Sequence, residues 1–91
     1  MLKTVSTKKY NKSLKKYLEL QKFSISKLEN VIIKLQNQEL LEKQYQDHPL
    51  NGKLSNQREC HIYPDILLVY EVVEDKLILF LVNIGSHSEL F

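Results

Sequence analysis

Residues 47–70 read DHPLNGKLSNQRECHIYPDILLVY, and this stretch decides the fold. Its first six residues predict a tight polar turn, because Pro49 fixes φ and Gly52 tolerates a positive φ. Residues 57–63 then alternate at period two, which predicts a strand. One face of this strand carries Glu59, His61 and Tyr63, and the other carries Arg58, Cys60 and Ile62. We place Glu59 and His61 on the open face of the sheet.

The segment at residues 66–73, ILLVYEVV, is apolar on both faces and is therefore expected to be a central, buried strand. A third strand is expected at residues 77–84, after a polar link of hairpin length at residues 74–76. Strands joined by such short links pair antiparallel. Residues 2–5 are expected to add a short edge strand.

Two helices are expected between the edge strand and residue 47. Ser6 or Thr7 should cap the first, at residues 7–21. Ser26-Lys27-Leu28-Glu29 has the form of a capping box for the second, at residues 26–38. A short link makes the two helices antiparallel. The predicted core comprises Leu14, Leu18, Leu28, Val31, Ile32, Leu35, Leu67, Val69 and Phe80.

The predicted fold class is α+β: two antiparallel N-terminal helices packed on one face of a small antiparallel sheet, in the order β-α-α-β-β-β. Ninety-one residues are expected to form one domain, residues 1–91. The single cysteine rules out an internal disulfide, and the lysine-containing N-terminus lacks the apolar segment of a secretory signal. The apolar runs are too short to span a bilayer. We therefore expect a cytoplasmic protein without a membrane partner.

Charge is distributed unevenly along the chain. Residues 1–27 contain eight lysines and one glutamate, whereas the remaining residues contain five basic and ten acidic side chains. A basic half of this kind suits a polyanion such as RNA, or an acidic protein partner. A solvated helix face would have the same composition, so both interpretations stay open.

The histidines are the candidates for chemistry, because imidazole exchanges protons near neutral pH. A metal site made of His48, Cys60, His61 and His87 is disfavoured, since neighbours on a strand point to opposite faces and no CxxC or HxxxH spacing occurs. No cofactor is expected. Acid–base cleavage of a phosphodiester needs only a base, an acid and a cation. Histidines can fill the first two roles, and Arg58 with Lys53 the third.

Three blocks of sequence, DHPLNG at 47–52, RECHIYPDILLVY at 58–70 and GSHSELF at 85–91, closely resemble the YafQ branch of the RelE-like toxins. These are the ribonuclease halves of bacterial type II toxin–antitoxin pairs. The resemblance implies a metal-independent endoribonuclease, an mRNA interferase that cuts mRNA in the ribosomal A site and leaves a cyclic phosphate. It also implies a cognate antitoxin that neutralises the toxin, which would be monomeric when free and hetero-oligomeric with its antitoxin.

Carried over by position, the resemblance implies site residues in two groups. The catalytic residues would be His48, His61, Asp65 and His87. The RNA-binding residues would be Arg58, Glu59 and Phe91, with Phe91 at the rim of the site; Lys53 joins them as the second cation expected above. We expect His87, His48, His61 and Asp65 to surround one shallow site on the open face of the sheet. His87 should be the principal proton-transfer group, with His48 or His61 in the opposite role and Asp65 orienting an imidazole or helping as base.

The chain departs from the family pattern at two positions. Ile66 stands where some members have tryptophan, and Asn83 stands where many have arginine. A neutral amide cannot replace a cation next to a phosphorane. The alternative prediction is therefore a catalytically weak or degenerate toxin that only binds RNA or its antitoxin.

Overall fold

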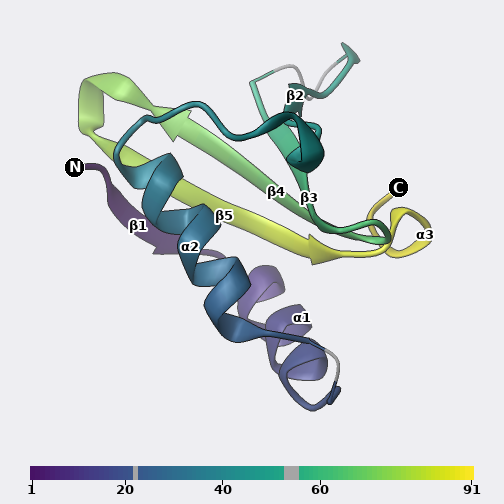
Figure 1. Ribbon diagram of the computed structural model, residues 1–91. Helices are drawn as coiled ribbons and strands as arrows, with labels where there is room; N and C mark the ends of the chain where they lie inside the picture. Colours follow the sequence, from purple (N-terminus) through teal and green to yellow (C-terminus); the bar gives the residue numbers. More distant parts are fainter. Residues whose placement is uncertain (22, 53–55) are drawn as a thin grey trace.

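Five strands form one sheet in the order β1-β5-β4-β3-β2 (Figure 1). The computed structural model describes residues 1–21, 23–52 and 56–91. The strands are β1 (Lys3–Ser6), β2 (His48–Pro49), β3 (Arg58–Tyr63), β4 (Ile66–Val73) and β5 (Ile78–Gly85). The helices are α1 (Lys8–Leu18), α2 (Ile25–Gln36) and α3 (His87–Leu90), and the short 3-10 turns are η1 (Lys43–Tyr45) and η3 (Glu74–Lys76).

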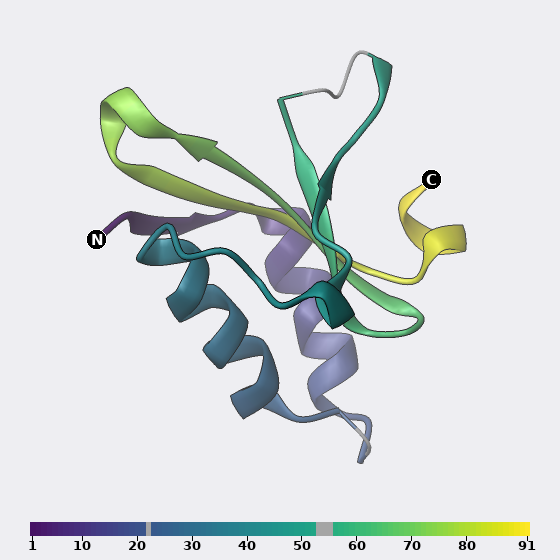
Figure 2. The same cartoon turned by 45° about the horizontal axis from the view of Figure 1, so that its top comes forward.

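The α+β class and the helical pair are confirmed. Buried side chains of both helices join those of β3, β4 and β5 in one core, and α2 returns beside α1 in the opposite direction (Figure 2). The sheet is mixed rather than fully antiparallel, because β1 pairs parallel with β5. Both helices separate β1 from the later strands in sequence, so no short link imposes the antiparallel direction on this pair.

The predicted central strand is confirmed with the predicted bounds. β4 pairs antiparallel with β3 on one side and β5 on the other. Four consecutive residues in it, Leu67 to Tyr70, are buried. Side chains on both faces of β4 are therefore removed from solvent, as expected of an apolar strand without alternation.

The core prediction is largely confirmed, with two errors. Leu28, Val31, Leu35, Leu67 and Val69 are buried, and Leu14 and Ile32 are partly buried against the core. Leu18 was predicted wrongly, because it is 49% exposed at the last turn of α1. Phe80 was also misplaced: it is only half-buried, whereas its neighbour Leu79 is fully buried. A shift of one residue exchanges the two faces of a strand.

Helix caps were predicted correctly for α1 and wrongly for α2. The Thr7 hydroxyl caps α1 and accepts a hydrogen bond from the backbone N–H of Tyr10. The cap of α2 is Ser24 rather than Ser26, and this helix begins at Ile25 rather than at residue 26. The predicted capping box at residues 26–29 therefore lies inside the first turn of α2.

The ends of β2 and β5 bring the candidate site residues into one region. His48 and Pro49 pair with β3, so part of the predicted turn is strand; Gly52 has the expected positive φ of 69°. α3 follows directly after β5, at the end where β3 turns into β4 (Figure 2). Among the helices in the described part of the chain, none is long and apolar enough to cross a membrane.

Candidate active site

A buried carboxylate lies at the centre of the site. Glu59 on β3 is only 5% exposed and is paired across the strands with His48 on β2. Its Oε1 lies 2.8 Å from Nε2 of His48. Its Oε2 is buried without a hydrogen-bond partner among the described residues. A buried carboxylate oxygen is costly unless a proton or donor reaches it, so Glu59 is well placed to accept one.

The proton positions on His48 follow from its two neighbours. Its Nδ1 lies 2.7 Å from the backbone carbonyl of Gln46, and a carbonyl can only accept, so Nδ1 carries a proton. The close approach of Nε2 to the Glu59 carboxylate then requires a further proton on one of the two groups. His48 and Glu59 together can therefore hold or release one proton.

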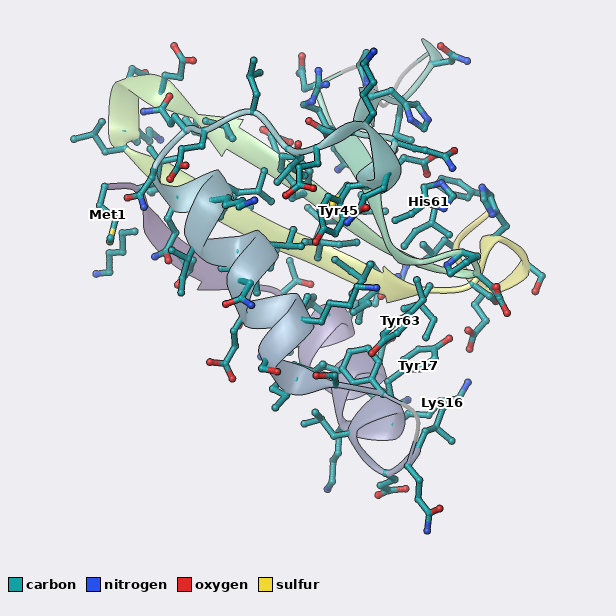
Figure 3. The ribbon with its side chains drawn as sticks, in the orientation of Figure 1. Met1, Lys16, Tyr17, Tyr45, His61 and Tyr63 are labelled. Carbon is teal, nitrogen blue, oxygen red and sulfur yellow. The ribbon has the colours of Figure 1, made fainter. Side chains whose placement is uncertain are left out.

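Two further imidazoles lie next to this pair. The rings of His61 and His87 are 5.8 Å apart between centroids, and those of His87 and Phe91 are 6.2 Å apart. One ligand atom from each of Glu59, His61 and His87 lies within 4.8 Å of the others. His61 extends from β3 toward the C-terminal segment (Figure 3), and its Nδ1 donates to the carbonyl of Pro64 at 3.1 Å. This leaves Nε2 of His61 available for proton exchange.

We call Glu59, His48, His61 and His87 the carboxylate–histidine cluster. Most of it faces a shallow pocket of about 380 Å³, lined by His48, Pro49, Leu50, Asn51, Glu59, His87 and Phe91. Phe91 is 60% exposed and lies at the edge of this pocket. The structure therefore brings together the three histidines and Phe91 expected from the sequence.

Two predicted site residues lie elsewhere in the described part of the chain. Asp65, in the turn after β3, lines a separate pocket of about 310 Å³ with Leu20, Phe23, Tyr63, Pro64 and Ile66. Arg58 contacts Asp47 at 3.4 Å, and Asp47 also accepts a hydrogen bond from buried Tyr70. Arg58 thus lies on the helix-covered side of β3, opposite His61, and forms an ion pair at the sheet edge. Lys53 lies outside the described residues.

The short helix α3, which carries His87, is attached to α1. The Glu89 carboxylate accepts hydrogen bonds from Tyr17, from Lys16 and from both the backbone and the hydroxyl of Ser86, the cap of α3. Hydrogen bonds from Lys16 and Tyr17 lower the pKa of Glu89 from 4.5 to about 2. Burial and the hydrogen bond to Glu89 raise the pKa of Tyr17 to about 12. These contacts hold His87 at the mouth of the pocket.

The cluster also has the composition of a metal site. One carboxylate and two imidazoles, from Glu59, His61 and His87, suit Zn²⁺ or Cu²⁺. Cys60 cannot contribute, because it is fully buried on the other face and burial raises the pKa of its thiol to about 12. The ligand set rejected from the sequence included Cys60, and the burial of Cys60 agrees with that rejection; the set that the structure brings together contains Glu59 instead.

Comparison with known proteins decides the family. A family model described as "Bacterial toxin of type II toxin-antitoxin system, YafQ" matches residues 2–91. The chain belongs to the YafQ toxin family. A copper-bound mutant toxin from Helicobacter pylori is 48% identical over the whole of both chains, with a TM-score of 0.91. YafQ in the Escherichia coli DinJ–YafQ complex is 27% identical over 99% of this chain and 97% of that one, with a TM-score of 0.86.

Among curated proteins, the mRNA interferase toxin YafQ of E. coli K12 is 43% identical over 47 residues. This alignment covers 52% of the chain and spans about half the length of that relative.

Asn83, one of the two departures from the YafQ-family pattern, lies near a lysine, Lys9. Asn83, in place of the usual arginine, lines a pocket of about 240 Å³ together with Lys9 of α1 and Phe91. The Asn83 side chain accepts a hydrogen bond from the backbone N–H of Ile84 at 2.9 Å. Lys9 therefore lines the same pocket as the position where this YafQ-family toxin has an amide instead of a guanidinium.

One residue of the site was given another role from the sequence, and one was missed. Glu59 was expected on the open face with His61 and was assigned to RNA binding, whereas in the structure it contacts His48. Glu89 was missed, although Ser86 and Glu89 have the spacing of a capping box, which the structure contains. That spacing was the signal that could have found it.

Proposed function

We propose that this YafQ-family toxin is an endoribonuclease that cleaves mRNA by acid–base catalysis, with residues 1–91 acting as one toxin domain. The observation that carries the proposal is the approach of Glu59, His61 and His87 to within 4.8 Å, with His48 in contact with Glu59, beside a shallow open pocket. Three imidazoles and one carboxylate supply both a base and an acid. The E. coli relatives named mRNA interferase toxins support the same activity.

In the proposed reaction, the ribose 2′-oxygen attacks the adjacent phosphorus and the bond from phosphorus to the 5′-oxygen breaks. The products are a 2′,3′-cyclic phosphate and a 5′-hydroxyl. After releasing the proton held between Nε2 of His48 and Oε1 of Glu59, the His48–Glu59 pair accepts the proton of the 2′-hydroxyl in its place. His87, exposed beside Phe91, donates a proton to the leaving 5′-oxygen. His61 donates to the charge that develops on the phosphate.

The remaining site residues would bind the RNA. Phe91 is exposed and can stack on a base. Lys9, near Asn83, would hold a phosphate, and Lys53 and Arg58 remain proposed RNA contacts. We give Asp65 a binding rather than a proton-transfer role, because it lines a different pocket from the cluster. Every proton transfer is assigned to a side chain, so the reaction needs no metal, and a metal bound to the cluster would block it.

The proposed partners are mRNA on the ribosome and a cognate antitoxin, with the free toxin monomeric. The complex of E. coli YafQ with DinJ supports the antitoxin. Cleavage of translated mRNA would place the protein in the cytoplasm. Isolation with the product of the neighbouring gene would test the antitoxin assignment.

The test is cleavage of labelled RNA, alone and in ribosome complexes, by wild type and by His87→Ala. A positioned acid typically contributes about 10²- to 10⁴-fold in rate, and we expect a loss of that order. Ser88→Ala, a change at the next residue of α3, is the matched control and should cleave normally. The wild type should also cleave in EDTA. Unchanged cleavage by His87→Ala, or complete loss of cleavage in EDTA, would refute the mechanism.

The second candidate is a degenerate toxin that binds RNA or antitoxin without cutting. Asn83 favours this alternative, because the usual arginine would have stabilised charge on the phosphate. This alternative would be supported if the wild type bound RNA tightly but did not cleave it, either with or without ribosomes.

A further inference from the structure

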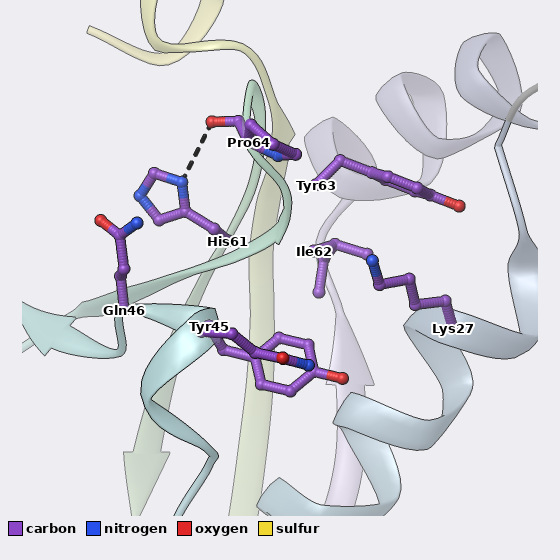
Figure 4. A pocket seen from close by; sticks show the side chains of 8 residues that line it. Lys27, Tyr45, Gln46, His61, Ile62, Tyr63 and Pro64 are labelled. Carbon is purple, nitrogen blue, oxygen red and sulfur yellow. Dashed lines mark hydrogen bonds between the residues drawn. The ribbon is translucent and has the colours of Figure 1, made fainter.

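A second pocket, beside the carboxylate–histidine cluster, has the features of a ligand site. It measures about 340 Å³ and lies between η1, the beginning of α2 and the end of β3 (Figure 4). We call it the side pocket; its lining residues are Lys27, Gln44, Tyr45, Gln46, His61, Ile62, Tyr63 and Pro64. His61 belongs both to this lining and to the cluster, so the two regions adjoin.

Two residues that line the side pocket, Gln46 and Pro64, form hydrogen bonds to proposed catalytic imidazoles. Gln46 has a left-handed backbone, with φ of 48°, and its carbonyl accepts from Nδ1 of His48. Its side chain lies beside the ring of His61 (Figure 4). Pro64, on the opposite side of that ring, accepts from Nδ1 of His61. A molecule in the side pocket would therefore lie next to the groups proposed to act on the scissile phosphate.

The chemistry of the lining fits a nucleobase. The amides of Gln44 and Gln46 each offer a donor and an acceptor, as the edge of a base requires. Tyr45 and Tyr63 provide aromatic surface, on which bases stack. The ammonium group of Lys27 lies 4.4 Å from the centroid of the Tyr63 ring, where it can also reach a phosphate. Among the described residues that form this lining, none has an acidic side chain.

We propose that the side pocket binds the RNA base next to the scissile phosphate and that Gln44 and Gln46 determine which base is preferred. This inference rests on the proposed ribonuclease function. The proposal assigns the contact with the base to η1 and to Gln46, the residue after it. None of the groups proposed for proton transfer belongs to these residues.

Direct binding can be tested without cleavage, by NMR titration of the labelled protein with the four nucleoside 3′-monophosphates. We expect chemical shift changes at Gln44, Tyr45 and Gln46, with one base binding more tightly than the others. Gln44→Ala with Gln46→Asn should weaken that binding about tenfold, the order expected for one or two lost hydrogen bonds. Asparagine is chosen at Gln46 because it tolerates the left-handed backbone and keeps the carbonyl that holds His48.

The matched control is Gln38→Asn. Gln38 also has a left-handed backbone, with φ of 55°, but it follows the C-terminal end of α2. It is about 16 Å along the helix from Lys27, at 1.5 Å per residue. This variant should bind nucleotides as the wild type does.

The second arm compares cleavage sites in a random RNA pool. The double variant should lose the base preference at one position beside the cleaved bond, and the control should retain it. The inference would be overturned if the double variant kept the base preference of the wild type and nucleotides caused no chemical shift changes at the side pocket. It would also be overturned if an antitoxin peptide caused such changes and nucleotides did not. A wild type that cuts no RNA would refute the proposed function, while the titration would still decide whether the pocket binds a base.

Discussion

Replacing Glu89 by glutamine should weaken the attachment of α3 to α1. The glutamine side chain has the same shape and can still accept from Tyr17 and Ser86, but it cannot pair with the ammonium group of Lys16. The variant therefore removes the charge and little else. We expect a less stable protein with a less firmly positioned His87.

The magnitude follows from the pKa of Glu89, which is lowered from 4.5 to about 2. Taken in full, a shift of this size corresponds to about 3 kcal/mol, at about 1.4 kcal/mol per unit. The Glu89 side chain is 39% exposed, however, so solvent screens the interaction. We therefore expect a loss of about 1 kcal/mol at neutral pH. Because the folded pKa is the lower one, this contribution is present above about pH 4.5 and is lost as the pH falls toward 2.

The assay is urea denaturation of wild type and Glu89→Gln at a series of pH values between 7 and 3. The difference in unfolding free energy should shrink steadily below pH 4.5. Glu29→Gln, a change at an exposed glutamate of α2, should cause no comparable difference. A difference for Glu89→Gln that does not depend on pH, or no difference at pH 7, would contradict the assignment of an ionised carboxylate bridging α1 and α3.

Three further predictions concern charge. Changing the exposed residues Lys8, Lys12 and Lys15 together to glutamate should weaken RNA binding. The slope of the logarithm of the binding constant against the logarithm of the salt concentration should become shallower by up to about 0.7 for each lost phosphate contact. An unchanged slope would mean that these lysines only make the protein more soluble. Lys9→Ala should slow RNA cleavage about tenfold, and adding Asn83→Arg should restore the rate, because either cation can stabilise the phosphorane; a double variant as slow as Lys9→Ala would count against this. Zn²⁺ should inhibit cleavage and EDTA should reverse the inhibition, since Glu59, His61 and His87 can chelate it; cleavage insensitive to Zn²⁺ would exclude that site.

Local patterns sufficed for most of the secondary structure. The apolar segment at residues 66–73 predicted the central strand with its observed bounds, and Thr7 was a correct helix cap. Alternation along β3 correctly separated buried Cys60 and Ile62 from the face that carries His61. These features depend on neighbours a few residues apart, which the sequence contains directly.

Errors arose where two patterns competed locally. Ser24 and Ser26 can both cap a helix, and the capping-box spacing favoured the wrong one. In β5, Leu79 and Phe80 are adjacent and both apolar, so composition could not decide which faced the core. The sheet register decides it, and that register depends on pairing with distant strands.

Residue types and their order along the chain were enough to single out His48, His61 and His87 as the candidates for chemistry. Their arrangement depends on tertiary contacts: β2 pairs with β3, so His48 meets Glu59, and Glu89 attaches α3 to α1, so His87 meets His61. The ion pair of Arg58 with Asp47, which also accepts from Tyr70, is likewise a tertiary contact, on the face of β3 to which alternation assigns Arg58. Such contacts join residues from 11 to more than 70 positions apart, and their geometry is set by the packing of the whole domain rather than by local spacing.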